Sequence, residues 1–134
     1  MSYRIYDKQD KKWIENNIYL SPSGGLYKPS KSLFGKSKMT LMDEERFIYH
    51  KFIDLYDKNN RPIFIGDYLE ATVSEDRIVR GIVAYAIELS AYIILCFDED
   101  EYFTLGSEVC KYIEKIGNVF DGFEDEKYKN QQTL

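Results

Sequence analysis

The chain between residues 68 and 97 decides the fold, and it reads YLEATVSEDRIVRGIVAYAIELSAYIILCF. It contains the apolar runs Tyr68–Val73, Ile78–Tyr85 and Tyr92–Phe97, and a polar turn separates the first two. Short runs rich in Val, Ile and Tyr that are bounded by turn residues are typical of strands. Gly81, inside the second run, indicates a bulge or a bend that curves a small sheet toward a barrel.

Further short strands are expected on both sides of this stretch. The run Phe47–Leu55 precedes it and Tyr102–Leu105 follows it. The short segment Ile63–Ile65 is apolar, and Gly66-Asp67 then turns the chain into the strand Tyr68–Val73. Ser107–Tyr112 is ambiguous, because Ser107 also suits the cap of a longer helix ended by a glycine. We favour one helical turn followed by a strand over Ile113–Phe120.

The N-terminal part begins with a predicted hairpin, in which Tyr3–Tyr6 forms one arm and Trp13–Tyr19 the other. Together these elements predict a mostly β fold, namely a small, partly open, SH3-like barrel with an N-terminal hairpin and at most one or two short helical turns.

A basic segment follows the hairpin. Residues 21–38 are rich in Gly, Ser, Pro and Lys, and no acidic residue occurs between Glu15 and Asp43. The composition predicts a flexible loop, and long loops in compact domains are usually functional or mobile. Lysines can meet phosphates and aromatic rings can stack on unpaired bases. The candidate contact residues for a nucleic acid or an acidic partner are Tyr27, Lys28, Lys31, Phe34, Lys36 and Lys38.

Length and composition limit the remaining possibilities. The chain has 134 residues, of which 44% are hydrophobic, and this predicts a single β-rich domain over residues 1–123 and a flexible polar tail over 124–134. The longest apolar run, Ala91–Phe97, is far shorter than a membrane helix, and the N-terminus lacks the apolar core of a signal peptide. We therefore expect a cytoplasmic protein with no membrane partner.

The charge is unevenly distributed. Residues 1–60 carry 11 basic and 8 acidic side chains, whereas residues 61–134 carry 7 and 15, so the net charge of −5 is the sum of +3 and −8. An acidic chain is poorly suited to binding duplex nucleic acid without sequence preference, because each phosphate contact needs a local cation. A local basic patch can still suffice for such binding.

Residues that carry enzyme chemistry are few. His50 is the only histidine and lies mid-strand with no motif around it, so we expect it to be structural or solvent-facing. Cys96 and Cys110 lack metal-ligand spacing, and no phosphate-binding glycine motif occurs. Asp98–Glu101 is expected to be a solvated turn rather than a cation loop, since it lacks the spaced ligand pattern. We therefore expect no catalytic residues, no metal, no cofactor and no small-molecule substrate.

Three segments together resemble a known family. They are the opening Tyr3-Arg4-Ile5-Tyr6-Asp7-Lys8, the central Leu55–Leu69 with Asp57-Lys58-Asn59-Asn60-Arg61-Pro62-Ile63-Phe64-Ile65-Gly66-Asp67, and the closing Ile113–Phe120 with Ile116-Gly117-Asn118. Their order and spacing are similar to those of the YopX family of phage and prophage proteins. The resemblance covers most of residues 3–121, with 21–46 unaccounted for, and Asn60 stands where the family usually has Gly.

The resemblance implies a phage-derived protein with a small β-rich fold and no known catalytic group. With the aromatic content of 16%, it favours a non-enzymatic accessory or regulatory protein that acts in the bacterial host by protein binding or self-association. The alternative is single-stranded nucleic-acid binding through the basic loop between Lys28 and Lys38. A protein partner or a homo-oligomer is expected before a nucleic acid.

Overall fold

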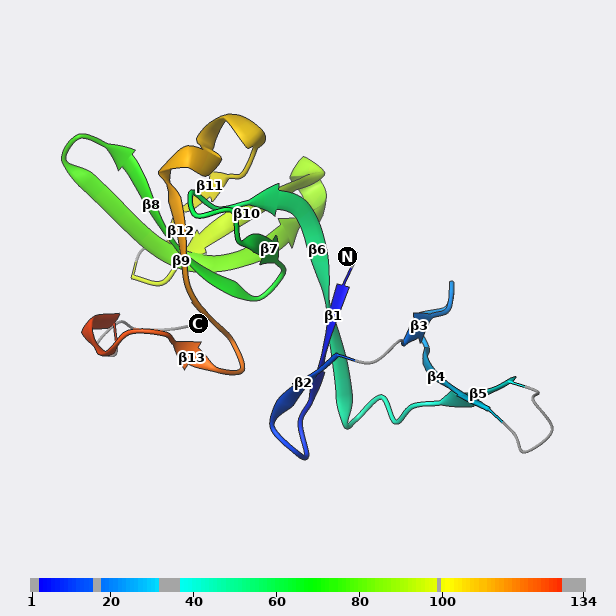
Figure 1. Cartoon of the computed structure of the whole chain (residues 1–134). Coiled ribbons are helices and arrows are strands. Elements are labelled where there is room, and N and C mark those ends of the chain that lie inside the picture. Colours follow the sequence, from blue (N-terminus) through cyan, green and yellow to red (C-terminus); the bar gives the residue numbers. More distant parts are fainter. Residues whose placement is uncertain (1–2, 16–17, 32–36, 99, 129–134) are drawn as a thin grey trace. The chain divides into compact units, whose positions relative to one another are not determined.

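The computed structural model describes residues 3–15, 18–31, 37–98 and 100–128 (Figure 1). It divides into an N-terminal unit, Arg4–Tyr49, and a C-terminal unit made of Met1–Tyr3 and His50–Leu134. The single domain predicted over residues 1–123 stays a prediction.

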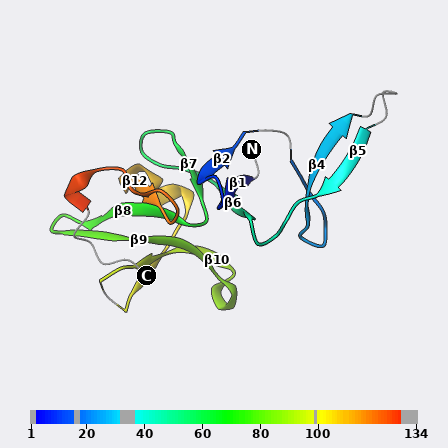
Figure 2. The same cartoon turned by 90° about the horizontal axis from the view of Figure 1, so that it is seen from below.

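The main sheet of the C-terminal unit has the strand order β11-β10-β9-β8-β12-β13, and Figure 2 shows its strands β8, β9, β10 and β12. Every neighbouring pair in it is antiparallel. The sheet curls into an open half-barrel, so the prediction of a mostly β fold with a partly open barrel is confirmed. Its strands are β8 (Asp67–Ser74), β9 (Arg77–Ala86), β10 (Ala91–Cys96), β11 (Tyr102–Thr104), β12 (Ile113–Asn118) and β13 (Gly122–Phe123).

Gly81 lets β9 and β10 approach closely, but it forms no bulge. Its register is continuous, with Leu69 of β8 on one side and Cys96 of β10 on the other. A Cβ at this position would collide with the carbonyl oxygen of Leu95. Of the two expected alternatives, a bulge or a bend, the continuous register excludes the bulge at Gly81, and the register shifts occur instead at Thr72/Ser74 and Lys115/Gly117.

Both faces of the main sheet are covered by apolar side chains. The first face carries the larger core, in which Leu69 and Val83 of the sheet pack with Ile53 of β6 (Phe47–Tyr56) and Ile63 of β7 (Pro62–Phe64). Residues alternate between the faces of a strand, so Tyr68 points to the second face. There it packs in a separate cluster with Phe97, Ile116 and Tyr128.

Helical structure in the described part of the chain is limited to three 3-10 segments, where the sequence predicted at most one or two turns. They are η1 (Ile87–Leu89), η2 (Ser107–Tyr112) and η3 (Glu126–Tyr128). The prediction of a helical turn at Ser107–Tyr112 followed by a strand is confirmed, because β12 begins at Ile113.

The C-terminal tail is more ordered than its polar composition predicted. Residues 124–128 were expected to be flexible, but Tyr128 in η3 is buried and packs on Phe123, with 6.0 Å between the ring centroids. One aromatic side chain thus anchors a segment that is otherwise polar. Residues 129–134 of the predicted tail lie outside the described residues.

The N-terminal unit contains the predicted hairpin, formed by β1 (Tyr3–Asp7) and β2 (Lys12–Ile14). The first residues of β6 adjoin it, giving the order β2-β1-β6 within this unit. A second sheet has the order β3-β4-β5, with bounds Tyr19–Leu20, Leu26–Lys31 and Ser37–Leu41.

The flexible loop expected over residues 21–38 is wrong where β4 and the start of β5 replace it. Pro29 lies within β4, and proline usually interrupts a ladder because it lacks an N–H. The amide of Met42 donates to the carbonyl of Leu26, so the alternate residues of β4, Pro29 among them, direct their backbone groups away from β5. The short β3 ends its pairing at Tyr27, so the position of Pro29 needs no N–H.

Candidate functional site

A groove of about 650 Å³ opens into the C-terminal unit and is the main candidate site. Four of its half-buried side chains, Val73, Phe103, Leu105 and Val109, also pack on the larger core. The groove is therefore a place where the hydrophobic core reaches solvent. Its lining comes from β8, β10, β11, η2 and β12, and comprises Ala71, Thr72, Val73, Ser74, Glu75, Ile94, Phe103, Thr104, Leu105, Val109, Tyr112 and Ile113.

The strand β11 forms one wall of the groove and one end of the main sheet. Its bonds to β10 involve Glu101 and Leu105, because the amide of Leu105 donates to the carbonyl of Tyr92 and the carbonyl of Glu101 accepts from the amide of Cys96. Backbone groups alternate in an antiparallel ladder, so those of Tyr102 and Thr104 point away from β10. Within the described residues, this edge of the sheet carries no further strand.

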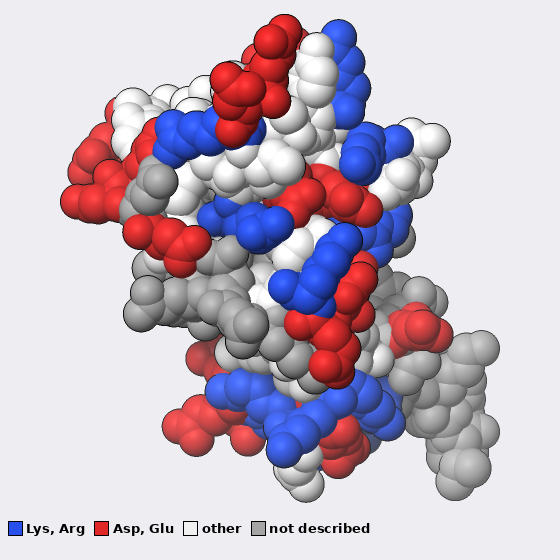
Figure 3. Space-filling view, turned by 90° about the vertical axis from the view of Figure 1, so that its left-hand side faces the viewer, with Lys and Arg blue, Asp and Glu red and all other residues white. Residues whose placement is uncertain are grey.

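The end of the unit where β8 turns into β9 is acidic. Arg77 donates to both carboxylate oxygens of Glu101, at 3.1 and 2.5 Å, which brings the β8–β9 and β10–β11 turns together. The only basic side chain among the described residues of these turns is Arg77, whereas the acidic ones are Glu75, Asp76, Asp98, Asp100 and Glu101. Acidic side chains gather at the upper left of Figure 3, which faces this end of the unit.

Lys28 and Lys38, two of the basic residues predicted as contacts, lie in the N-terminal unit, on the β4–β5 hairpin. The register pairs Lys28 with Thr40 and Ser30 with Lys38, so Lys28 and Lys38 share one face of the hairpin. Both lysines are exposed. Tyr27 lies on the opposite face, across from Leu41.

The rest of that predicted set is only partly described. Lys31 ends β4, and its side chain lies outside the described part of the structure. Phe34 and Lys36 lie outside the described residues altogether. The structure therefore brings two of the four predicted lysines onto one face and leaves the other two as predictions.

A second hollow, of about 610 Å³, lies beside Lys28 in the N-terminal unit, and its charges are mixed. Arg46 lines it and donates from Nε and from one terminal nitrogen to the two oxygens of Asp7, at 2.9 and 2.8 Å. The hydrogen bond from Arg46 holds the pKa of Asp7 far below its usual range, against the opposing effect of burial. This cation is committed to carboxylates, so the hollow is less suited to an anion than its lysine suggests.

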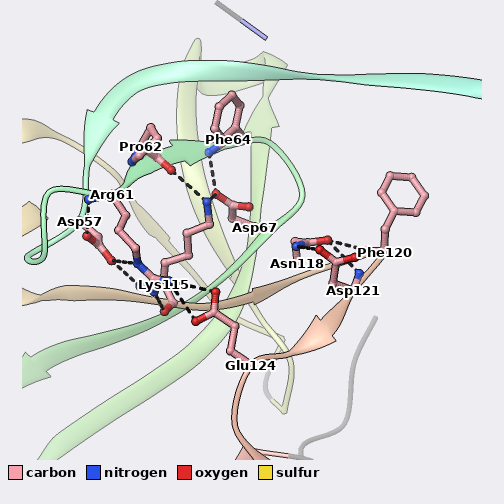
Figure 4. Close-up of polar contacts among 10 residues, drawn as sticks. All are labelled: Asp57, Arg61, Pro62, Phe64, Asp67, Lys115, Asn118, Phe120, Asp121 and Glu124. Atoms are coloured by element: carbon pink, nitrogen blue, oxygen red, sulfur yellow. Dashed lines mark hydrogen bonds and ion pairs between the residues drawn. The ribbon is translucent and has the colours of Figure 1, made fainter. Parts of the chain in front are cut away.

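Two of the three segments that carry the family resemblance, the central and the closing one, meet in a polar cluster of the C-terminal unit (Figure 4). Asp57 is its centre and is 3% exposed. One carboxylate oxygen accepts from the amides of Asn59 and Arg61, both at 2.9 Å, and the other accepts from the amide of Lys115 at 2.9 Å. Burial alone would raise the pKa of Asp57, but these donors outweigh it and leave the pKa below its ordinary value.

Arg61 extends this cluster by joining three segments. Its guanidinium donates to the carbonyl of Lys115, to Asp57 at 3.4 Å and to both carboxylate oxygens of Glu124 at 3.0 Å. The turn that follows β6 is thereby tied to β12 and to the chain beyond β13.

The second carboxylate of the central motif, Asp67, is fully buried at the start of β8. It accepts from the amide of Phe64 at 2.8 Å and forms an ion pair with Lys115 Nζ at 3.1 Å. The same ammonium donates to the carbonyl of Pro62 at 3.1 Å. These contacts join the β7–β8 turn to β12, so the motif residues serve the fold.

His50 is placed by packing. It stacks on Phe120 with a centroid separation of 5.2 Å, and a Cβ on Gly66 would meet its ring at 2.6 Å. Phe120 lies in a turn, in which the amides of Phe120 and Asp121 both donate to Asn118 Oδ1 at 3.0 Å. The ring of His50 therefore fills the space that Gly66 leaves.

The two cysteines are free thiols. Cys96 is buried in the larger core, and Cys110 donates to the carbonyl of Gly106 at 3.4 Å. Burial raises the pKa of the Cys110 thiol, and Glu108 adds to the effect. A thiol with a raised pKa is a weak nucleophile at neutral pH.

Sequence reasoning missed the groove as a site. The available signal was the apolar residues of the segment around Val109, which the sequence presented only as one side of a helical turn. Nothing in one segment shows that Val73 and Phe103 lie across from it, because the lining is assembled from five elements.

The chain matches the family model described as YopX protein over residues 2–124. This phage-type class of small, mostly β proteins was the one that the three motif segments resembled. The match spans most of the chain, so the chain belongs to the YopX family. No curated protein matches it.

Among solved structures, the chain is similar to the crystal structure of protein EF1440 from Enterococcus faecalis. The TM-score is 0.52 at 20% sequence identity, and the match covers 89% of this chain and 92% of that one. At this identity the likeness concerns the fold. In the described part of the chain, no helix is both long enough and apolar enough to cross a membrane.

Proposed function

We propose that this YopX family member is a non-enzymatic accessory or regulatory protein that binds a protein partner in the groove of its C-terminal unit. The observation that carries the proposal is the exposure of core side chains such as Phe103 and Val109 within a groove of about 650 Å³. Concave pockets of this volume with a mostly apolar lining and a few polar groups are typical of ligand-binding sites.

The groove has the energetic features of a protein interface. Burying one side chain the size of Leu contributes about 1.5–3 kcal/mol, so two such side chains offset part of the free-energy cost of association. Tyr112 lines it and is about half exposed, at 51%. Tyrosine is enriched at protein interfaces because it combines a large apolar ring with a polar tip.

Selection from a random peptide library displayed on a carrier tests this proposal, with the full chain as bait. We expect enrichment of peptides with bulky apolar residues, and loss of their binding by at least about tenfold in Val109→Glu, which puts a charge into the groove. Ile87→Glu is the matched control, since Ile87 is 82% exposed and is not among the lining residues. Selection of no peptides, or equal binding to Val109→Glu, contradicts the proposal.

Single-stranded nucleic-acid binding by the β4–β5 hairpin is the second candidate. The observation that favours it is the placement of Lys28 and Lys38 on one face. Electrostatic binding falls steeply with salt, so we expect retention of labelled single-stranded RNA or DNA at low salt and its loss in the double variant Lys28→Ala/Lys38→Ala. Lys58→Ala, at an exposed lysine of the other unit, is the control. No retention by the unmodified chain at low salt rejects this candidate.

A further inference from the structure

We infer that the groove takes its partner as an added strand on β11, and that the partner is an extended segment of the form apolar–x–apolar–x–Lys/Arg running antiparallel to β11. The inference rests on the proposed function and names the class of partner. It is built from the backbone edge of β11, the apolar lining and the charge at one end of the groove.

The backbone edge supplies the pairing. The N–H and C=O groups of Tyr102 and Thr104 point away from β10, which leaves two donors and two acceptors at the end of the sheet. An extended peptide can join such an edge through main-chain hydrogen bonds, and its alternate side chains then give specificity. In this arrangement the edge strand of the free protein becomes an inner strand.

The lining fixes which partner positions are apolar. Residues directly opposite each other in an antiparallel pair point to the same face of the sheet. Phe103 and Leu105 both line the groove, so the partner residues opposite them also face it. These two partner positions are separated by one residue, and both are expected to carry bulky apolar side chains.

The charge at one end fixes the third position and the direction. The partner residue opposite Glu101 points to the same face as the two apolar ones, and in an antiparallel strand it follows them in sequence. This partner residue lies near the turns that carry Glu75, Asp76 and Asp100. Arg77 is the basic side chain that the structure describes in these turns, and it already binds Glu101. A lysine or arginine there is favoured by the surplus of carboxylates.

Fluorescence anisotropy with a labelled peptide, Thr-Leu-Thr-Leu-Thr-Lys-Thr, tests the inference on the full chain. We expect binding that Thr104→Pro weakens by at least about tenfold, because proline removes an outward N–H and obstructs the added strand. Thr104→Val keeps that N–H and is expected to stay within about twofold. The N–H of Thr104 is not bonded to β10, so Thr104→Pro leaves the existing ladder intact.

Two peptide variants keep the test independent of protein folding. Norleucine in place of the lysine is expected to weaken binding severalfold at low salt and to remove most of the salt dependence. The peptide with the reversed sequence places its lysine away from Glu101 and is expected to bind more weakly. Equal binding of all three peptides overturns the proposed charge and direction.

The outcomes separate this inference from the proposed function. If binding survives Thr104→Pro but is lost in Val109→Glu, strand addition is wrong and the groove remains a binding site. If this peptide fails while the library yields other groove-dependent sequences, the proposed motif is wrong. If sedimentation shows a dimer that Thr104→Pro dissociates, a second copy of β11 is the occupant and the inference is overturned. If no peptide of any kind binds, the proposed function fails as well.

Discussion

Replacing Asp57 by Asn tests the reasoning about the polar cluster most fully. The carboxylate accepts two amides on one oxygen and the amide of Lys115 on the other. An asparagine that keeps its oxygen on the first pair turns its NH₂ group toward the N–H of Lys115, so two donors face each other in a buried site. The substitution preserves the shape of the side chain but changes its hydrogen bonding and removes the negative charge that faces Arg61.

The expected loss of stability follows from this count. A buried N–H left without an acceptor costs about 1–3 kcal/mol, and the two remaining hydrogen bonds lose the assistance of the charge. We expect Asp57→Asn to lower the free energy of unfolding by about 2–4 kcal/mol, which corresponds to roughly 6–14 °C in melting temperature for a chain of this length. Asp54→Asn is the control, since Asp54 is exposed and its φ of 62° suits Asn.

Urea unfolding followed by circular dichroism measures the effect, and its pH dependence gives a second check. The pKa of Asp57 is depressed in the folded state, so its contribution is present above the unfolded pKa, near 3.9, and is lost as the pH falls through the folded value. The gap between wild type and Asp57→Asn should be constant from pH 7 to about pH 5 and shrink below about pH 4. A gap under about 0.5 kcal/mol at pH 7, or one that widens in acid, refutes the reasoning.

Three further predictions use other contacts of the C-terminal unit. Gly117→Ala should destabilise it more than Gly122→Ala in the same urea assay, because both have positive φ but only a Cβ at Gly117 collides with backbone; equal losses contradict this. Tyr128→Ala should cost about 2–4 kcal/mol, since it empties the second aromatic cluster, and an unchanged melting temperature would show that the tail is not anchored. Cys110 should react with a thiol reagent at pH 7 more slowly than a free cysteine peptide, as its raised pKa requires; an equal rate would exclude this.

Much of the main sheet was predictable because each of its long strands corresponds to a separate apolar run in the sequence. The predicted bounds agree with those of β8, β9 and β10 to one residue at each end, for Tyr68–Val73, Ile78–Tyr85 and Tyr92–Phe97 respectively. Turn residues separate them, and β-branched and aromatic side chains fill them. The helical turn and strand after Leu105 also followed from local signals, namely a serine and a following apolar run, although Gly106 takes the N-cap position and no side chain makes a cap hydrogen bond.

The parts that sequence could not predict depend on contacts between distant segments. Strand β4 could not be predicted because its lysines and Pro29 are typical of a loop. Pro29 is tolerated in the strand because β3 does not extend far enough to need a hydrogen bond from an N–H at that position. The tail was hidden because one residue, Tyr128, anchors it. The groove exists only once the curled sheet brings Val73, Phe103 and Val109 together, and no single run of residues encodes that meeting.

The central claim is that a segment of another protein binds in the groove along β11. A titration of the ¹⁵N-labelled chain with the lysine-containing peptide, followed by two-dimensional NMR, tests it most directly. The account predicts that the amide signals of Thr104, Leu105 and Val109 move, and that those around Asp57 stay in place. Shifts confined to the β4–β5 hairpin, or none at saturating peptide, would contradict it.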